Sequence, residues 1–251
     1  MALQEELKEQ GDFLFKHRSN LPLLLLIVGL LIKTYQVLIV EVEGETILSE
    51  ILKMSSIFVG LFGLFIRIWT VGYTPSNTSG RNTNEGQVAE TINKSGLYSL
   101  TRNPLYVGNY LMWLAIAMLT GNIWFVIVFS LVFWIYYERI VYAEENFLRN
   151  KFGSAYLDWA KDVAIFIPKN LKYKKSSISF SWKKVLKNEK NGLFALFLLF
   201  FIFETFGQWL KDGTFLIDQK WIIFGMVASG IIYLILKLLK NTSVLSEEGR
   251  N

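Results

Sequence analysis

Long runs of uncharged, apolar residues constrain the fold of this chain more than any other feature of its sequence. With their weaker flanks, several of these runs reach the roughly 20 residues that cross a bilayer core as a helix. A helix satisfies its own backbone hydrogen bonds in lipid, so such runs favour membrane helices over a soluble core. The runs are Leu21–Ile32, Ser56–Ile66, Leu105–Leu119, Ile123–Tyr137, Gly192–Phe203 and Trp221–Leu236. They predict an all-α, polytopic membrane bundle of about six transmembrane helices.

The composition excludes several kinds of site and of partner. The chain has no cysteine and a single histidine, His17, so disulfides, thiolate metal sites and histidine-rich metal centres are excluded, and we expect no metal. No glycine-rich fingerprint follows a strand, and strands do not alternate with helices, so we expect no Rossmann domain. The net charge of +5 fits a cytoplasmic face that meets anionic lipid, and no nucleic-acid partner is needed to explain it.

The charges of the loops predict the orientation of the chain in the membrane. The connection Glu41–Glu50 carries four glutamates and no lysine or arginine. Lysine and arginine occur instead before the first apolar run, in Thr74–Asn103 and in Glu138–Lys190. The positive-inside rule therefore predicts that both termini and the two long loops are cytoplasmic, which agrees with an even number of spans.

Four charged residues interrupt the apolar runs or lie at their edges: Lys33, Arg67, Glu204 and Lys237. A charge at membrane depth costs about 2.5–3.5 kcal/mol on insertion scales, so it usually faces a partner, a cavity or the interface. Lys237 lies near the end of a run and is expected to extend to the interface. Lys33 and Arg67 could extend to the interface or face a partner or cavity inside the bundle. Glu204 is a candidate partner for both.

Two polar segments flank the helical hairpin that the third and fourth runs predict. The first, Gly96–Gly108, carries tyrosines, an arginine and a proline at the expected start of a helix, where the missing N–H of proline is tolerated. By composition alone it is an interfacial aromatic belt with a positive anchor. The second, Glu138–Leu148, continues the fourth run out of the membrane, with Glu138 and Glu145 on one helix face. Its composition fits a solvated helix end, but its tyrosines and phenylalanine indicate that part of it is covered.

In this order, the two segments resemble the isoprenylcysteine carboxyl methyltransferase family and related membrane phospholipid methyltransferases. The family pattern is roughly G-x-Y-x-x-x-R-H-P-x-Y-x-G, a helical hairpin, and then R…E-E-x-x-L…F-G-x-x-Y with a closing proline. The matching residues are Gly96, Tyr98, Arg102, Pro104, Tyr106, Gly108, Arg139, Glu144, Glu145, Phe152, Gly153, Tyr156 and Pro168. Two departures occur: Asn103 replaces the family histidine, and one extra residue lies between the glutamate pair and Leu148. Asn103 cannot carry a proton, but its amide can still orient a cofactor.

The resemblance implies S-adenosylmethionine-dependent methyl transfer at the boundary between membrane and cytosol, without a Rossmann fold. Carboxylates suit the charged amino-acid end of this cofactor, aromatic rings can shield its sulfonium, and arginines can hold an anionic acceptor oxygen. The expected catalytic residues are Arg102, Arg139 and Glu144. The expected cofactor-binding residues are Tyr98, Asn103, Pro104, Tyr106, Gly108, Glu144 and Glu145.

The same reasoning divides the chain into five segments. Residues 1–20 are a cytoplasmic amphipathic lead, since Met1–Asn20 is charged throughout and no cleavage pattern follows it. Residues 21–73 hold two membrane helices, and 74–170 form the methyltransferase core, with the helical hairpin and a cytoplasmic cofactor-binding segment. Residues 171–190 form a basic connector, and 191–251 hold a C-terminal pair of membrane helices and the tail.

The acceptor is expected to be an anionic lipid head group, because a phosphate or carboxylate oxygen needs no base whereas an amine must first lose a proton. Thr78–Asn82, Gln87, Ala89, Asn103-Pro104 and Gly108-Asn109 resemble a bacterial branch associated with methylation of the 1-phosphate of lipid A, which implies a bacterial inner membrane. Methylation of a prenylcysteine carboxylate or of the phosphatidylethanolamine nitrogen are alternatives. So is a lipid-binding or transport protein without enzymatic activity, although no repeated pair of interrupted helices supports transport.

Overall fold

The computed structural model describes residues 2–18, 21–40, 46–75, 78, 82–83, 86–87, 89–215, 219–240 and 242–247 of the 251-residue chain. Almost all of the regular structure in these residues is helical, as the apolar runs predict. The α-helices are α1 (Leu3–His17), α2 (Leu21–Tyr35), α3 (Ile47–Gly72), α4 (Pro104–Met118), α5 (Ile123–Phe152), α6 (Ser154–Asp162), α7 (Trp182–Asp212) and α8 (Lys220–Leu239). The short elements are η1 (Gln36–Val40), η3 (Leu97–Ser99), η4 (Ser243–Leu245) and the antiparallel strand pair β1 (Asn82–Thr83) and β2 (Gly86–Gln87).

Within the described residues, five helical segments are long and apolar enough to cross a membrane, which confirms a polytopic helical membrane protein. They are Leu23–Val40 and the helices α3, α5, α7 and α8. The remaining expected span forms α4, which has only 15 residues. At 1.5 Å per residue it is about 22 Å long, shorter than the roughly 30 Å hydrocarbon core. The helix starts at Pro104 and ends at Met118, before the turn that leads into α5.

The two longest helices extend well beyond what a membrane crossing requires. The helix α5 has 30 residues and α7 has 31, so each is about 45 Å long. In addition, α7 begins at Trp182, inside the segment 171–190 that the sequence predicted to be a connector. Ser181 caps its first turn by accepting a hydrogen bond from the backbone of Lys184. The Lys184 ammonium donates to the carbonyls of Thr74 and Pro75, at 2.8 and 2.7 Å, and this tertiary contact ties the first turn of α7 to the end of α3.

Close helix packing holds the bundle together, with α3 against α4, α7 against α8, and α1 against α5. Glycine permits the closest of these approaches. A Cβ atom at Gly63 of α3 would lie 2.7 Å from the carbonyl oxygen of Gly108 in α4, and one at Gly11 of α1 would lie 2.2 Å from the carbonyl oxygen of Arg139 in α5. Two buried clusters fill the bundle, one between α4 and α5 and one between α4 and α7.

The charges inside the bundle find partners that the sequence did not identify. Arg67 makes a bidentate ion pair with Glu189 of α7, at 2.7 Å from Nε to Oε2 and 2.8 Å from Nη2 to Oε1, and also donates to the Asn109 side chain. The suggested pairing of Arg67 with Glu204 is therefore wrong. Because α7 begins early, Glu189 is helical and lies beside Arg67. The Lys33 ammonium is buried and donates to the Leu119 carbonyl at 3.1 Å.

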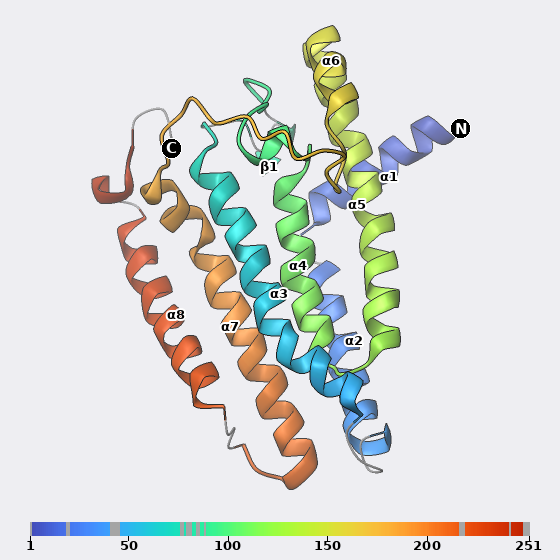
Figure 1. The fold of residues 1–251 in the computed structure, drawn as a ribbon, viewed down its shortest axis with the longest axis vertical. Coiled ribbons are helices and arrows are strands. Elements are labelled where there is room, and N and C mark those ends of the chain that lie inside the picture. Colours follow the sequence, from blue (N-terminus) through green and yellow to red (C-terminus); the bar gives the residue numbers. More distant parts are fainter. Residues whose placement is uncertain are drawn as a thin grey trace.

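Both ends of the described chain, the strand pair and α6 gather at one end of the bundle (Figure 1). The turn between α4 and α5, the last turn of α7 and the first turn of α8 lie toward the opposite end. This arrangement agrees with an even number of crossings. That the end carrying α6 is cytoplasmic stays a prediction from the loop charges.

Candidate active site

Hydrogen bonds fix the first part of the sequence motif to the segment that follows α6. The Gly96 N–H donates to the Lys174 carbonyl, and the Arg102 N–H donates to the Ala164 carbonyl, both at 2.8 Å. The Thr101 hydroxyl donates to the Ile165 carbonyl, also at 2.8 Å. The loop before α4 is thus fixed to the segment that follows α6, although more than sixty residues separate them in sequence.

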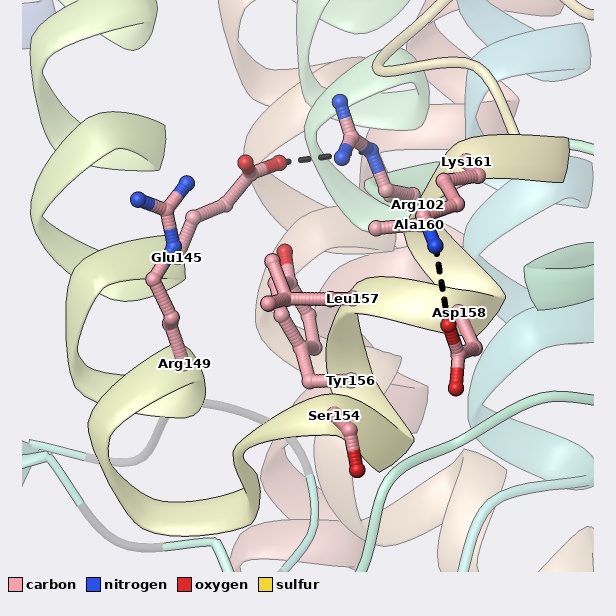
Figure 2. A pocket seen from close by; sticks show the side chains of 9 residues that line it. All are labelled: Arg102, Glu145, Arg149, Ser154, Tyr156, Leu157, Asp158, Ala160 and Lys161. Carbon is pink, nitrogen blue, oxygen red and sulfur yellow. Dashed lines mark hydrogen bonds and ion pairs between the residues drawn. The ribbon is translucent and has the colours of Figure 1, made fainter.

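A pocket of about 420 Å³ lies where α5, α6 and this loop meet (Figure 2). Its volume is within the roughly 300–1,000 Å³ of ligand sites. Gly153 ends α5 with a φ of 55°, a left-handed conformation that suits glycine, and α6 starts directly after it. The lining residues are Arg102, Glu145, Arg149, Ser154, Tyr156, Leu157, Asp158, Ala160 and Lys161.

Arg102 and Glu145, two of the predicted site residues, meet in this pocket (Figure 2). Arg102 Nε lies 3.3 Å from Glu145 Oε1, and the two side chains are 14% and 20% exposed. Both atoms are buried, and within the described part of the chain neither has a hydrogen-bond partner with good geometry. The two atoms compensate each other's charge as an ion pair but do not make a well-aligned hydrogen bond. The pair therefore offers one donor and one acceptor that a polar ligand can satisfy.

Two phenols adjoin the glutamate pair: Tyr156, which is buried, and Tyr98, which is partly buried. Burial, reinforced by the Glu145 charge, raises the pKa of Tyr156, whose ring packs edge-on against Trp159 at 5.7 Å. Burial and the Glu144 charge likewise raise the pKa of Tyr98, which comes from the η3 turn of the loop. Both phenols therefore remain neutral at physiological pH and can donate hydrogen bonds.

Glu144 points to a different neighbourhood from Glu145. The Tyr106 hydroxyl lies next to its carboxylate, and Arg18 at the end of α1 acts on it as a favourable charge. The Tyr106 ring packs against Tyr137 with 4.6 Å between centroids. The structure thus brings Tyr98, Tyr106 and Glu144 together on the inner side of α5, while Arg102 and Glu145 face the pocket.

Three predicted cofactor-binding residues shape the backbone and do not line this pocket. The Asn103 side chain donates to the Ile165 carbonyl at 3.3 Å, and Pro104 is buried at the first position of α4. A Cβ atom at Gly108 would lie 2.6 Å from Arg67 Cγ and 2.8 Å from the Gly63 carbonyl oxygen. These contacts give all three residues a structural role, in the loop before α4 or in helix packing. A role in cofactor binding stays a prediction.

The structure does not bring Arg139 together with Arg102. Arg139 Nε donates to the Gln10 side chain at 2.9 Å, and its Nη1 donates to the Ile135 carbonyl at 3.0 Å. Its guanidinium is thus directed at α1, because α1 packs on that face of α5. A catalytic role of Arg139 stays a prediction. Its position outside the pocket does not favour that role.

Sequence reasoning did not select several residues that line the pocket. Arg149 follows Glu145 by four residues on one helix, so both lie on the same face. This spacing could have identified Arg149 from the sequence. Asp158 and Lys161 of α6 form an exposed ion pair at 3.0 Å, and no pattern in the sequence distinguishes them from other surface charges. Of the loop that resembles the lipid A branch, residues 79–81 lie outside the described residues.

Comparisons with known proteins agree with the motif. Residues 55–155 match the family model described as phospholipid methyltransferase. The protein-S-isoprenylcysteine O-methyltransferase of Schizosaccharomyces pombe is 37% identical over 73 residues, which are 29% of this chain and 31% of that protein. The Xenopus laevis protein of the same name is 28% identical over 117 residues, or 47% of this chain and 41% of the relative.

A third relative carries a different name. The cobalt-zinc-cadmium resistance protein CzcN of Cupriavidus metallidurans is 30% identical over 123 residues, covering 47% of this chain and 52% of that protein. The chain thus spans between a third and about half of the length of these curated relatives. No solved structure matches it. The family match and the two isoprenylcysteine methyltransferases support the expected family, and the matched region contains the pair Arg102 and Glu145.

Proposed function

We propose that this chain is an S-adenosylmethionine-dependent O-methyltransferase that acts on an anionic lipid head group at the boundary between membrane and cytosol. The observation that carries this proposal is the pair Arg102 and Glu145. Its facing atoms are buried and lack hydrogen-bond partners among the described residues, and the pair lies at a pocket inside the region that matches the family model.

The residues at this pocket fit the cofactor that the family implies. The amino-acid end of S-adenosylmethionine carries an ammonium and a carboxylate, and Glu145 and Arg102 supply one complementary charge for each. Tyr156 adds a neutral hydroxyl beside Glu145. On the inner side of α5, the rings of Tyr98 and Tyr106 lie close to the Glu144 carboxylate, a combination that favours a cation. Bound there, the cofactor would supply a methyl group on a sulfonium.

The remaining charges favour an anionic acceptor. Arg149 lines the same pocket as Arg102, whereas the charge of Lys161 is balanced by its ion pair with Asp158. The Arg149 guanidinium can hold two oxygens of a phosphate or carboxylate at once. Such an oxygen is already a nucleophile, so the protein has only to position it and exclude water. An amine acceptor would first have to lose a proton, and the residues that line the pocket include no histidine.

The 1-phosphate of lipid A is the specific acceptor that we propose, on the resemblance of Asn103-Pro104 and Gly108-Asn109 to the bacterial branch. This assignment also places the protein in a bacterial inner membrane with the pocket facing the cytoplasm. A prenylcysteine carboxylate is the second candidate, because two relatives are named protein-S-isoprenylcysteine O-methyltransferase. Both acceptors present an anionic oxygen on an apolar anchor, so the residues proposed above serve either one.

Calorimetry on the purified protein in detergent tests cofactor binding. We expect S-adenosylmethionine and its demethylated product to bind the wild type, and Glu145→Gln to lower the affinity by about tenfold or more, since a hydrogen bond to a charged group contributes roughly 1.5–3 kcal/mol. Glu138→Gln is the matched control, because this carboxylate lies on the same helix but is exposed. The absence of binding by folded wild type would contradict the proposal. Equal affinities for the wild type and Glu145→Gln would contradict only the assignment of that residue.

A further inference from the structure

The segment between α6 and α7 exposes large apolar side chains although it belongs to no membrane-crossing helix. Residues 163–175 run from the end of α6 toward the start of α7, across the end of the bundle that carries the candidate site (Figure 1). Ile167 and Leu171 are 77% and 83% exposed, and Ile165 and Tyr173 are both 42% exposed. Exposed apolar side chains that gather in this way mark a surface that meets a protein or a membrane.

Both ends of this segment contact aromatic residues of membrane-crossing helices. The Phe166 ring packs edge-on against Trp134 of α5, with 5.3 Å between centroids, and Trp134 lies 50% exposed within the apolar run of that helix. At the other end, the indole N–H of Trp69 in α3 donates to the Tyr173 hydroxyl at 3.3 Å. The Trp69 ring in turn packs against Phe65, which is 51% exposed on α3. The segment is thus attached to the lipid-facing sides of two helices, where tryptophan and tyrosine typically mark the membrane interface.

The polar groups of the segment fit the same location. It contains no aspartate or glutamate, and its four lysines are exposed: Lys169, Lys172, Lys174 and Lys175. A lysine can keep its stem in apolar surroundings while its ammonium reaches water. Around Leu171, the Lys172 N–H donates to the Asn170 side chain at 3.1 Å and the Tyr173 N–H donates to the Leu171 carbonyl at 2.9 Å. This turn satisfies two backbone donors beside the most exposed apolar side chain, which lowers the cost of placing it near lipid.

The same segment holds the loop that carries Arg102. At one end, the Ala164 carbonyl accepts from the Arg102 N–H, and at the other the Lys174 carbonyl accepts from the Gly96 N–H, both at 2.8 Å. The Lys174 N–H also donates to the Ser99 hydroxyl at 2.9 Å. The loop is therefore attached to the segment at both of its ends, and a displacement of the segment would displace Arg102.

We propose that residues 163–175 lie in the membrane interface, with Ile167 and Leu171 inserted below the lipid head groups, and that this insertion holds the Arg102 loop in place. The two side chains lie in the chain between the aromatic attachments to α5 and α3, so the surface that these helices present to lipid continues across them. The contact is apolar and selects no particular head group. It does not depend on the proposed methyl transfer, because the position of the segment and the order of the loop are both measurable without it.

Spin labels test the position of the segment. The chain has no cysteine, so Ile167→Cys and Leu171→Cys each accept a single nitroxide, and the full chain is reconstituted in phosphatidylcholine bilayers. Collisions with oxygen, which concentrates in hydrocarbon, are compared with collisions with a water-soluble nickel complex. We expect the ratio of oxygen to nickel collisions to be several-fold higher at both positions than at Ala155→Cys, an exposed position on α6. Ratios equal to that of Ala155→Cys would overturn the proposal, and so would spin–spin broadening, which would indicate that a second copy of the chain covers this surface.

Hydrogen exchange tests the link between the segment and the loop. The double variant Ile167→Ser/Leu171→Ser replaces two exposed side chains, so the bundle itself should stay folded. In bilayers, the peptides that contain the Gly96 and Arg102 amides should exchange roughly tenfold faster than in the wild type, because the segment that accepts their hydrogen bonds loses its apolar anchors. Val244→Ser is the matched control, since Val244 is 55% exposed at the same end of the bundle but outside the segment (Figure 1). Equal exchange of these peptides in the wild type and the double variant would overturn the proposed link.

Discussion

The ion pair between Arg67 and Glu189 connects the C-terminal helices to the part of the chain that carries the candidate site, and removing it should destabilise the bundle measurably. Glu189 is 4% exposed and Arg67 is 21% exposed at their side chains, and two short hydrogen bonds join them. Removing one partner of a buried pair typically costs about 3–5 kcal/mol, because the other charge is left without compensation. In this variant Arg67 would keep its hydrogen bond to Asn109 and its partial exposure to solvent. We therefore expect Glu189→Gln to lower the free energy of unfolding by about 3 kcal/mol.

A double-mutant cycle separates the pair from the effects of each side chain. Arg67→Met should also cost about 3 kcal/mol, whereas the apolar double variant Arg67→Met/Glu189→Leu should cost much less than the sum, since replacing a whole buried pair is often close to neutral. Unfolding is followed by helical circular dichroism in mixed micelles of mild detergent and increasing dodecyl sulfate. Asp158→Asn is the control, because its ion pair with Lys161 is about 70% exposed on both sides and should contribute roughly 0.5 kcal/mol or less. A coupling energy below about 0.5 kcal/mol would refute the reasoning.

Three further predictions concern packing, pH and topology. Gly63→Ala should cost about 1–3 kcal/mol, because its Cβ atom would meet backbone atoms of α4 at 2.7–2.8 Å, whereas Gly192→Ala, with its nearest atoms at 3.5 Å, should be close to neutral in the same assay. Because the folded state holds the pKa of Tyr156 above its ordinary 10.0, its neutral form stabilises the fold below pH 10 and this contribution is lost at higher pH, so Tyr156→Phe should flatten the loss of stability above pH 10. Cysteine placed at Ser177 should be protected from an impermeant thiol reagent in intact cells while cysteine at Thr214 is labelled, and the reverse pattern would invert the orientation.

The sequence was sufficient for the fold class, because uncharged apolar runs of this length are stable only as membrane helices. It was not sufficient for the helix boundaries. The early start of α7 depends on the Lys184 ammonium reaching the carbonyls of Thr74 and Pro75, a contact between segments more than a hundred residues apart. The partner of Arg67 was missed for the same reason, since Glu189 was assigned to a connector and so was not considered as part of a helix.

For the candidate site, the motif identified the residues but not their arrangement. Arg102 and Glu145 were both selected, and the structure pairs them. The contacts of Gly108 were not predictable from its own neighbours, because they depend on Gly63 of another helix. The direction of Arg139 depends likewise on the docking of α1 at Gly11. Spacing along one helix is readable from a sequence, whereas contacts between helices need the tertiary structure.

Transfer of an isotopically labelled methyl group tests the central claim most directly. Purified protein in lipid micelles is incubated with S-adenosylmethionine labelled at its methyl group, together with lipid A, phosphatidylethanolamine or a prenylcysteine peptide in parallel reactions, and products are located by fragmentation mass spectrometry. The account predicts label on a lipid A phosphate oxygen, and a loss of at least tenfold with Glu145→Gln but not with Glu138→Gln. Label on the peptide carboxylate would support the second candidate, and label on the ethanolamine nitrogen would refute the O-methyl assignment. Folded protein that transfers label to none of these acceptors and does not bind S-adenosylmethionine would contradict the account.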